Sequence, residues 1–121
     1  MTAQNDSLTS RLARYREIKL SVTGRKSGRT ISTTVWFTMD GEAVCLLPVR
    51  GSDTQWYQNI LKNPTIRIDT RGVGGEFNTV AITDAKQVAS VIERFREKYG
   101  AGVKKYYSKF DVAVLASAKS E

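Results

Sequence analysis

Residues 31–49, ISTTVWFTMDGEAVCLLPV, carry the pattern that decides the fold. The first part, Ile31 to Thr38, is rich in β-branched and aromatic residues, which favour strands. The pair Asp40-Gly41 is typical of a tight type I′ turn, and Ala43 to Val49 forms a nearly continuous apolar run. Such a run is expected of a strand that is buried on both faces. The stretch therefore predicts a β-hairpin whose second strand lies deep in the core.

Alternating and apolar patterns predict further strands on both sides of this hairpin. They lie at 17–22, 65–70, 76–82 and 111–116, with a turn formed by Gly72, Gly74 and Gly75. Helices are expected where apolar residues recur at helical spacing. They run from Asp6 or Ser7 to about Glu17, from Ser52 or Asp53 to about Lys62, and from Thr83 to Gly100, with a short helical or loop piece at 103–108. Strands interspersed with helices predict a single α+β barrel domain over residues 1–121, with a frayed tail from Ser117.

The composition favours an acidic partner and excludes several kinds of chemistry. The net charge of +7 favours nucleic acid, an anionic membrane surface or a polyanionic small molecule. The sequence has no histidine and one cysteine, Cys45, which excludes histidine-based catalysis, the usual zinc ligand sets and an intramolecular disulfide. Cys45 lies in the apolar run, so we expect it to be a small buried hydrophobe. No secretory signal or apolar span is visible, which predicts a cytoplasmic protein without a transmembrane segment.

Residues 23–29, TGRKSGR, follow a predicted strand and form the leading candidate binding site. Glycines permit positive φ and let main-chain N–H groups approach a ligand. Successive N–H groups can form a concavity for an anion, to which arginine and lysine add charge and directed donors. The glycine spacing does not match a P-loop. Two interpretations fit: a grip for a phosphate or carboxylate, or a solvated basic turn on the surface.

Two weaker candidates follow later in the chain. Residues 50–53, RGSD, open a predicted helix, where free N–H groups attract anions, although taken alone a plain capped helix start with an exposed arginine explains them better. Tyr106 and Tyr107 are candidate proton donors, or an aromatic pair that closes the mouth of the barrel. There is no suggestive carboxylate pair and no nucleophile elbow. A chain so poor in reactive side chains fits chemistry carried by a cofactor.

Several motifs occur in a fixed order at close spacing. They are residues 23–29, Val35-Trp36-Phe37, Asp40-Gly41, residues 51–59 (GSDTQWYQN) and Asn63-Pro64. In this the sequence resembles the deazaflavin-dependent nitroreductase family, a branch of the flavin/deazaflavin oxidoreductases. The resemblance covers about Ile18 to Ile82 well and the C-terminal part loosely. It implies a split β-barrel of the FMN-binding type, with about five to seven mostly antiparallel strands and interspersed helices.

The resemblance also implies a cofactor, coenzyme F-420, which is an 8-hydroxy-5-deazaflavin with a phosphate and an oligoglutamate tail. Such a polyanion agrees with the excess of positive charge. In proteins of this family the basic turn holds the phosphate region or the tail, and two strand segments line the ring. The matching residues are Arg25, Lys26, Ser27, Gly28 and Arg29 for the turn, and Thr34, Val35, Trp36, Phe37, Pro48, Val49, Arg50 and Gly51 for the ring. Trp56 and Tyr57 match a helix motif that we expect to be mainly structural.

The activity that the resemblance implies is hydride transfer from reduced F-420 to an electron-poor acceptor, such as a quinone, a nitro compound or an activated alkene. Water, Tyr106 or Tyr107 is expected to supply the proton. The alternatives are an FMN-dependent oxidoreductase of the same fold, an inactive deazaflavin carrier, and a basic barrel that binds single-stranded nucleic acid. We expect no nucleic-acid partner, because the aromatic residues lie in buried-looking runs. The sequence leaves a homodimer open.

Overall fold

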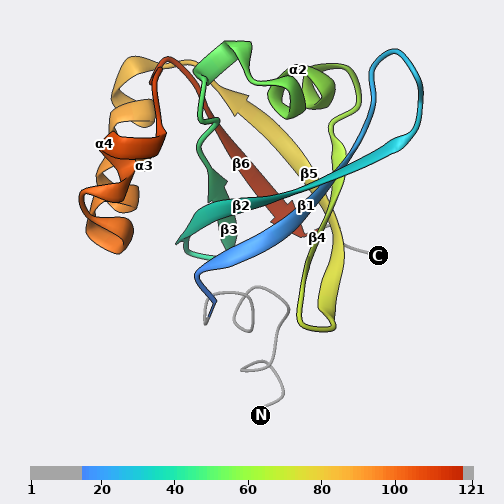
Figure 1. Ribbon diagram of the computed structural model, residues 1–121, viewed down its shortest axis with the longest axis horizontal. Coiled ribbons are helices and arrows are strands. Elements are labelled where there is room, and N and C mark those ends of the chain that lie inside the picture. Colours follow the sequence, from blue (N-terminus) through green and yellow to red (C-terminus); the bar gives the residue numbers. More distant parts are fainter. Residues whose placement is uncertain (1–14, 119–121) are drawn as a thin grey trace.

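The structure of the protein, a computed structural model, describes residues 15–118 (Figure 1). Within this range six strands close into a barrel in the order β1-β2-β3-β6-β5-β4, and every neighbouring pair is antiparallel. This confirms the expected α+β barrel. The strands are β1 (Glu17–Thr23), β2 (Thr30–Asp40), β3 (Ala43–Leu46), β4 (Thr65–Thr70), β5 (Val73–Ile82) and β6 (Ala113–Ala118). The helices are the 3₁₀ helix η2 (Gly51–Asp53) and the α-helices α2 (Gln55–Lys62), α3 (Ala85–Tyr99) and α4 (Gly102–Tyr106).

Two apolar clusters stabilise the barrel. Alternation along the strands directs Leu20, Ile68 and Phe77 into the interior, where all three are fully buried. The second cluster lies between the outer face of the barrel and α3, which contributes Val91 and Phe95. Figure 1 shows α3 and α4 together on one side of the barrel, so this flank is covered by helices.

Strand β3 belongs to both clusters, as its apolar run predicts. Val44 and Leu46 belong to the inner cluster, while Cys45 and the adjoining Leu47 belong to the cluster under α3. The strand is shorter than predicted, because it ends at Leu46. Burial raises the pKa of the Cys45 thiol above its usual value, which agrees with a small buried hydrophobe.

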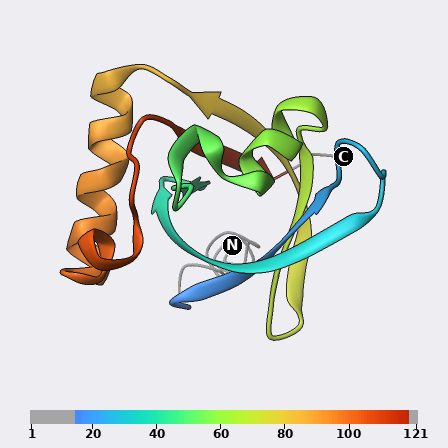
Figure 2. The ribbon, with the colours of Figure 1, turned by 45° about the horizontal axis from the view of Figure 1, so that its top comes forward.

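Strand β2 changes partner along its length, and this splits the barrel open beside α2. Residues 30–36 pair with β1, whereas β3 pairs only with residues 37–40. The second edge of residues 30–36 therefore has no partner among the described strands. Figures 1 and 2 show η2 and α2 passing above this part of β2. The first five residues of β2 are exposed along the opening.

The two tight hairpin turns differ from the prediction. Residues Gly41 and Glu42 connect β2 to β3, and only Gly41 has a positive φ (62°). A positive φ at the first central residue alone is the pattern of a type II′ turn rather than type I′. Asp40 is the last residue of β2, so Gly41 is the first central residue of the turn and not the second. The type I′ pattern occurs instead at Arg71 and Gly72, where both φ angles are positive. Gly74 and Gly75, predicted as part of that turn, lie inside β5.

Helix starts and chain ends differ from the prediction by small shifts. Helix α2 has Thr54 as its N-cap rather than Ser52 or Asp53, and α3 has Asp84 rather than Thr83. The Asp84 carboxylate accepts a hydrogen bond from the N–H of Gln87 (3.0 Å). Strand β6 continues to Ala118, so the frayed tail predicted from Ser117 begins too early. The predicted first helix, from Asp6 or Ser7, lies mostly outside the described residues, and its last part, Tyr15 to Glu17, is not helical.

Two side chains connect the C-terminal end of α3 to β2 and to the two residues that precede β1. Tyr99 Oη accepts a hydrogen bond from the Phe37 N–H (2.9 Å) and, as a donor, lies 2.8 Å from the Phe37 carbonyl oxygen and 2.6 Å from that of Arg16. Lys98 Nζ donates to the carbonyls of Phe37 (2.9 Å) and Tyr15 (3.1 Å). Burial raises the pKa of Tyr99 to about 12 and, helped by Arg16, lowers that of Lys98 to about 8. None of the helices in the described range combines the length and apolar character needed to cross a membrane.

Candidate functional site

A long groove runs along the open side of β2, between this strand and the η2–α2 segment. It consists of two adjoining cavities of about 380 and 550 Å³, which share the side chains of Thr33, Thr54 and Trp56. One cavity reaches the basic turn between β1 and β2, and the other reaches Tyr106 at the end of α4. Figures 1 and 2 place this turn and α4 at opposite ends of β2. The two ends of the groove are chemically different.

The basic turn is a compact loop closed by its first glycine. Gly24 donates through its N–H to the Arg29 carbonyl (2.8 Å) and accepts from the N–H of Gly28 (3.0 Å). Gly28 has a φ of 73°, a conformation that other residues rarely adopt. Ser27 Oγ accepts from the Arg29 N–H (3.2 Å). The loop thus holds its shape through its own main chain.

The cations of this turn fall into two groups. The Arg25 guanidinium donates to Asn59 Oδ1 (2.7 Å) and Gln55 Oε1 (3.0 Å), both on α2. Lys26 and Arg29 are exposed and make no side-chain hydrogen bond or ion pair with any residue in the described range. Of the predicted turn residues, Arg25, Lys26 and Ser27 line this end of the groove, whereas Gly28 and Arg29 belong to the same turn but line neither cavity.

The second predicted anion site, residues 50–53, already holds an anion of the chain itself. Asp111, which precedes β6, accepts hydrogen bonds from the Ser52 N–H (2.9 Å) and the Ser52 hydroxyl (2.6 Å). Lys109 Nζ lies 3.8 Å from this carboxylate and 3.2 Å from that of Asp53. Gly51 has a φ of 55°, and a Cβ there would collide with Asp111. The other three N–H groups of this turn donate to Thr54 Oγ1, the Pro48 carbonyl and the Arg50 carbonyl, so the expectation of free N–H groups at residues 50–53 is wrong.

We expect Asp111→Asn to lower the free energy of unfolding at neutral pH by about 1 kcal/mol, since a partly exposed, charge-assisted pair of hydrogen bonds is weakened. The Ser52 hydrogen bonds hold the pKa of Asp111 below its ordinary value of 3.8. A lowered pKa stabilises the folded state above that value, and the contribution is lost as the pH falls through the folded-state pKa. Urea unfolding of the wild-type protein and of Asp111→Asn should therefore give free energies of unfolding whose difference shrinks below pH 3.8. A difference independent of pH contradicts this account.

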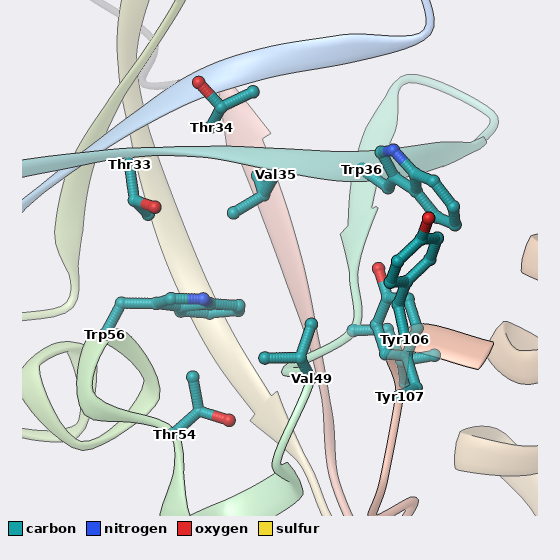
Figure 3. A pocket seen from close by; sticks show the side chains of 10 residues that line it. Thr33, Thr34, Val35, Trp36, Val49, Thr54, Trp56, Tyr106 and Tyr107 are labelled. Carbon is teal, nitrogen blue, oxygen red and sulfur yellow. The ribbon is translucent and has the colours of Figure 1, made fainter. Parts of the chain in front are cut away.

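The other end of the groove is aromatic and apolar. Thr33 and Val35 point from β2 toward Trp56 and Val49, whereas Thr34 lies on the opposite side of the strand (Figure 3). Trp56 is largely buried, and Val49 is 39% exposed. The cavity between them has a volume of about 380 Å³, and its side-chain polar groups come from threonines, tyrosines and the two tryptophans. A mostly apolar lining with a few polar groups is typical of small-molecule sites.

Trp36 forms the far wall of this cavity. Its indole stacks on Tyr99 at 4.2 Å with an interplanar angle of 6°, and Tyr106 meets it edge-on at 5.7 Å. Gly102 leaves room for the indole, because a Cβ at this position would approach the Trp36 ring to 2.8 Å. The orientation of Trp36 is therefore set from α3 and α4, which are distant in sequence.

The two predicted proton donors lie in different surroundings. Tyr106 is 59% exposed at the mouth of the cavity. Tyr107 is buried against Phe95 and Trp36, and burial raises the pKa of its hydroxyl above the usual range. Both line the aromatic cavity.

Four of the predicted ring-binding residues line neither cavity. Phe37 and Pro48 are fully buried in the protein, Gly51 is buried in η2, and the exposed Arg50 is the residue before η2. Conversely, Thr33, Thr54, Gln55 and Asn59 line the groove, although the sequence alone suggested no binding role for them. The signal for the last two is a polar pair at helical spacing beside the Trp56-Tyr57 motif, with an asparagine in mid-helix.

Comparison with known proteins assigns the chain to a family. The sequence pattern of the F420H(2)-dependent quinone reductases matches residues 1–116. The chain belongs to the F420H(2)-dependent quinone reductase family. This confirms the resemblance carried by the motifs around the basic turn. No curated protein matches this family member significantly.

Several solved structures share the fold of this F420H(2)-dependent quinone reductase family member. A conserved hypothetical protein, Rv2991 from Mycobacterium tuberculosis, is 17% identical with a TM-score of 0.74, over 99% of this chain and 82% of the other. HutZ, the heme storage protein from Vibrio cholerae, is 13% identical with a TM-score of 0.68, over 88% and 83%. An F420-H2 dependent reductase (FDR-A) is 14% identical with a TM-score of 0.66, over 84% and 94%. At these identities the likeness concerns the fold alone.

Proposed function

We propose that the protein is a reductase that transfers a hydride from reduced coenzyme F-420 to an electron-poor acceptor. A quinone is the first candidate acceptor, since the family is described by quinone reduction, and a nitro compound or activated alkene comes next. The observation that carries the proposal is the asymmetry of the groove, which is cationic at one end and aromatic at the other. This asymmetry matches a ligand that combines a flat ring with an anionic tail.

The residues along the groove fit both parts of the coenzyme. Lys26, which lines the groove, and Arg29, which belongs to the same turn, offer two charges without a partner among residues 15–118 to the phosphate or the carboxylates of the tail. Trp56 and Val49 offer apolar surface to the ring, within a cavity of about 380 Å³. Both cavities fall in the range of about 300–1,000 Å³ that small-molecule sites occupy. When bound, reduced coenzyme F-420 supplies hydride chemistry from carbon 5 of its ring.

The chain's own contribution is binding and orientation. Two cations at one end hold the tail, and the cavity walls at the other end restrict the ring. The ring of the coenzyme and the acceptor are thereby held in a defined relative orientation. Apolar side chains keep water away from the reacting face. Of the two tyrosines, Tyr106 is the better placed to offer a proton from its Oη to an acceptor that enters through the mouth, because it is exposed there.

The test uses the two tryptophans of the chain, Trp36 and Trp56, both of which line the groove. Titration with coenzyme F-420 should quench their fluorescence saturably at micromolar concentration. Trp36→Phe and Trp56→Phe each leave one tryptophan, so the quenching in each variant reports on one wall of the groove. Oxidation of the reduced coenzyme by menadione, followed by absorbance, tests turnover. A protein without saturable quenching contradicts the proposal, and binding without turnover leaves only the carrier alternative.

Two observations separate the alternatives with different ligands. A protein that is yellow as purified, with a flavin absorbance spectrum, indicates FMN. Steeply salt-dependent binding of single-stranded oligonucleotides indicates a nucleic-acid binder instead.

A further inference from the structure

The strongest unassigned feature is the contact between the basic turn and helix α2. We infer that Arg25 is a positioning residue that locks the turn onto Asn59 and Gln55, and that Lys26 and Arg29 are the cations that meet the anionic part of the ligand. This inference rests on the proposed function and goes beyond it, because it divides the basic motif into a structural part and a binding part.

Four hydrogen bonds form the lock. Asn59 Oδ1 accepts from both the main-chain N–H (3.1 Å) and the guanidinium (2.7 Å) of Arg25. Gln55 Oε1 accepts from the second guanidinium nitrogen (3.0 Å), and Lys62 Nζ donates to the Arg25 carbonyl oxygen (3.2 Å). Both main-chain groups and two side-chain nitrogens of Arg25 are thus used by α2.

One face of α2 carries all the helix residues that contact Arg25. Gln55, Asn59 and Lys62 are spaced by four and three residues, so they lie on one face of α2. Trp56 and Ile60 lie on another face and are buried in the core. Asn59 itself is only 3% exposed, so its carboxamide oxygen needs a partner inside the protein, and Arg25 supplies it.

The lock has a consequence for binding. A turn with two glycines samples many conformations in isolation, and ordering it on ligand binding costs affinity. A turn that is already fixed presents its free N–H groups and cations in one arrangement. The neighbouring Lys26 and Arg29 have no internal partner in the described range, so they remain available. Loss of the lock should therefore weaken binding of the anionic part of the ligand selectively.

The experiment compares two probes: coenzyme F-420, and an 8-hydroxy-5-deazaflavin truncated before the phosphate. In Asn59→Leu we expect the affinity for coenzyme F-420 to fall on the order of tenfold, with the affinity for the truncated ring unchanged within about twofold. Asn59→Asp keeps an oxygen acceptor and should restore binding. Asn78→Leu removes an asparagine outside the groove and is the matched control.

If Asn59→Leu does not fold, Gln55→Met provides the second variant, since Gln55 is exposed and methionine keeps the helix propensity. It should show a smaller loss with the same selectivity. Equal losses for both probes, or no loss for either, overturn the inference while the proposed function stands. A wild-type protein that binds neither probe overturns the proposed function, and the inference with it.

Ionic strength gives an independent readout. Arg25→Met should weaken binding of coenzyme F-420 without changing the slope of affinity against salt, whereas Lys26→Met should reduce that slope. A reduced slope in Arg25→Met would show that Arg25 meets the ligand directly.

Discussion

Replacing Lys26 and Arg29 together by glutamine is expected to weaken the binding of coenzyme F-420 on the order of 100-fold. Each charge-assisted contact contributes about 1.5–3 kcal/mol in favourable geometry, and screening at an exposed turn brings both toward the lower limit. Neither side chain has an internal partner in the described range, so stability should hardly change. Isothermal titration or tryptophan quenching measures the effect.

The matched control for this variant is Lys86→Gln with Arg96→Gln, which removes the same charge from helix α3, outside the groove. Its affinity should stay within about twofold of the wild-type value, because long-range attraction is screened beyond about 10 Å. Equal affinities in the binding variant, the control and the wild-type protein would contradict electrostatic capture by the basic turn.

Tyr99→Phe is expected to lower the free energy of unfolding by about 2–3 kcal/mol, although it removes a single oxygen atom. That oxygen accepts from the buried Phe37 N–H and contacts two carbonyl oxygens, so its loss leaves a buried donor without a partner. The ring remains, so the stack under Trp36 is kept. Urea unfolding at neutral pH measures the effect.

Tyr106→Phe serves as the control for Tyr99→Phe, because it makes the same chemical change at a residue that is 59% exposed. Its stability should match the wild-type protein within about 0.5 kcal/mol. Comparable losses in the free energy of unfolding of both variants would contradict the role assigned to the Tyr99 hydroxyl, which hydrogen-bonds α3 to β2.

The strand content of this fold follows from local sequence, because alternation and apolar runs report which faces are buried. Glu17 to Thr23 alternates into the barrel, and Val44 to Leu47 is apolar on both faces since α3 covers the outside. Boundaries are less determined. Thr83 and Asp84 are both good N-caps, and only the actual hydrogen bond to Gln87 selects Asp84.

The groove could be predicted only in part, because its decisive contacts join residues far apart in the chain. The basic turn is visible in the sequence, but its attachment to Asn59 spans 34 residues. The use of the Ser52 N–H by Asp111 spans 59 residues, and nothing in RGSD alone indicates it. The motifs thus locate the site, while the division of roles among its cations depends on tertiary contacts.

The change of partner along β2 has a consequence for how this protein can diversify. Alternate N–H and C=O groups of residues 30–36 border the groove, and no strand within residues 15–118 pairs with them on that edge. Such a row of donors and acceptors can satisfy the edge of a heterocycle, and no side-chain replacement deletes it. Substitutions at Thr33 or Val35 change the shape of the cavity and leave these main-chain donors and acceptors in place. The same main-chain edge can therefore bind different planar ligands after a few substitutions.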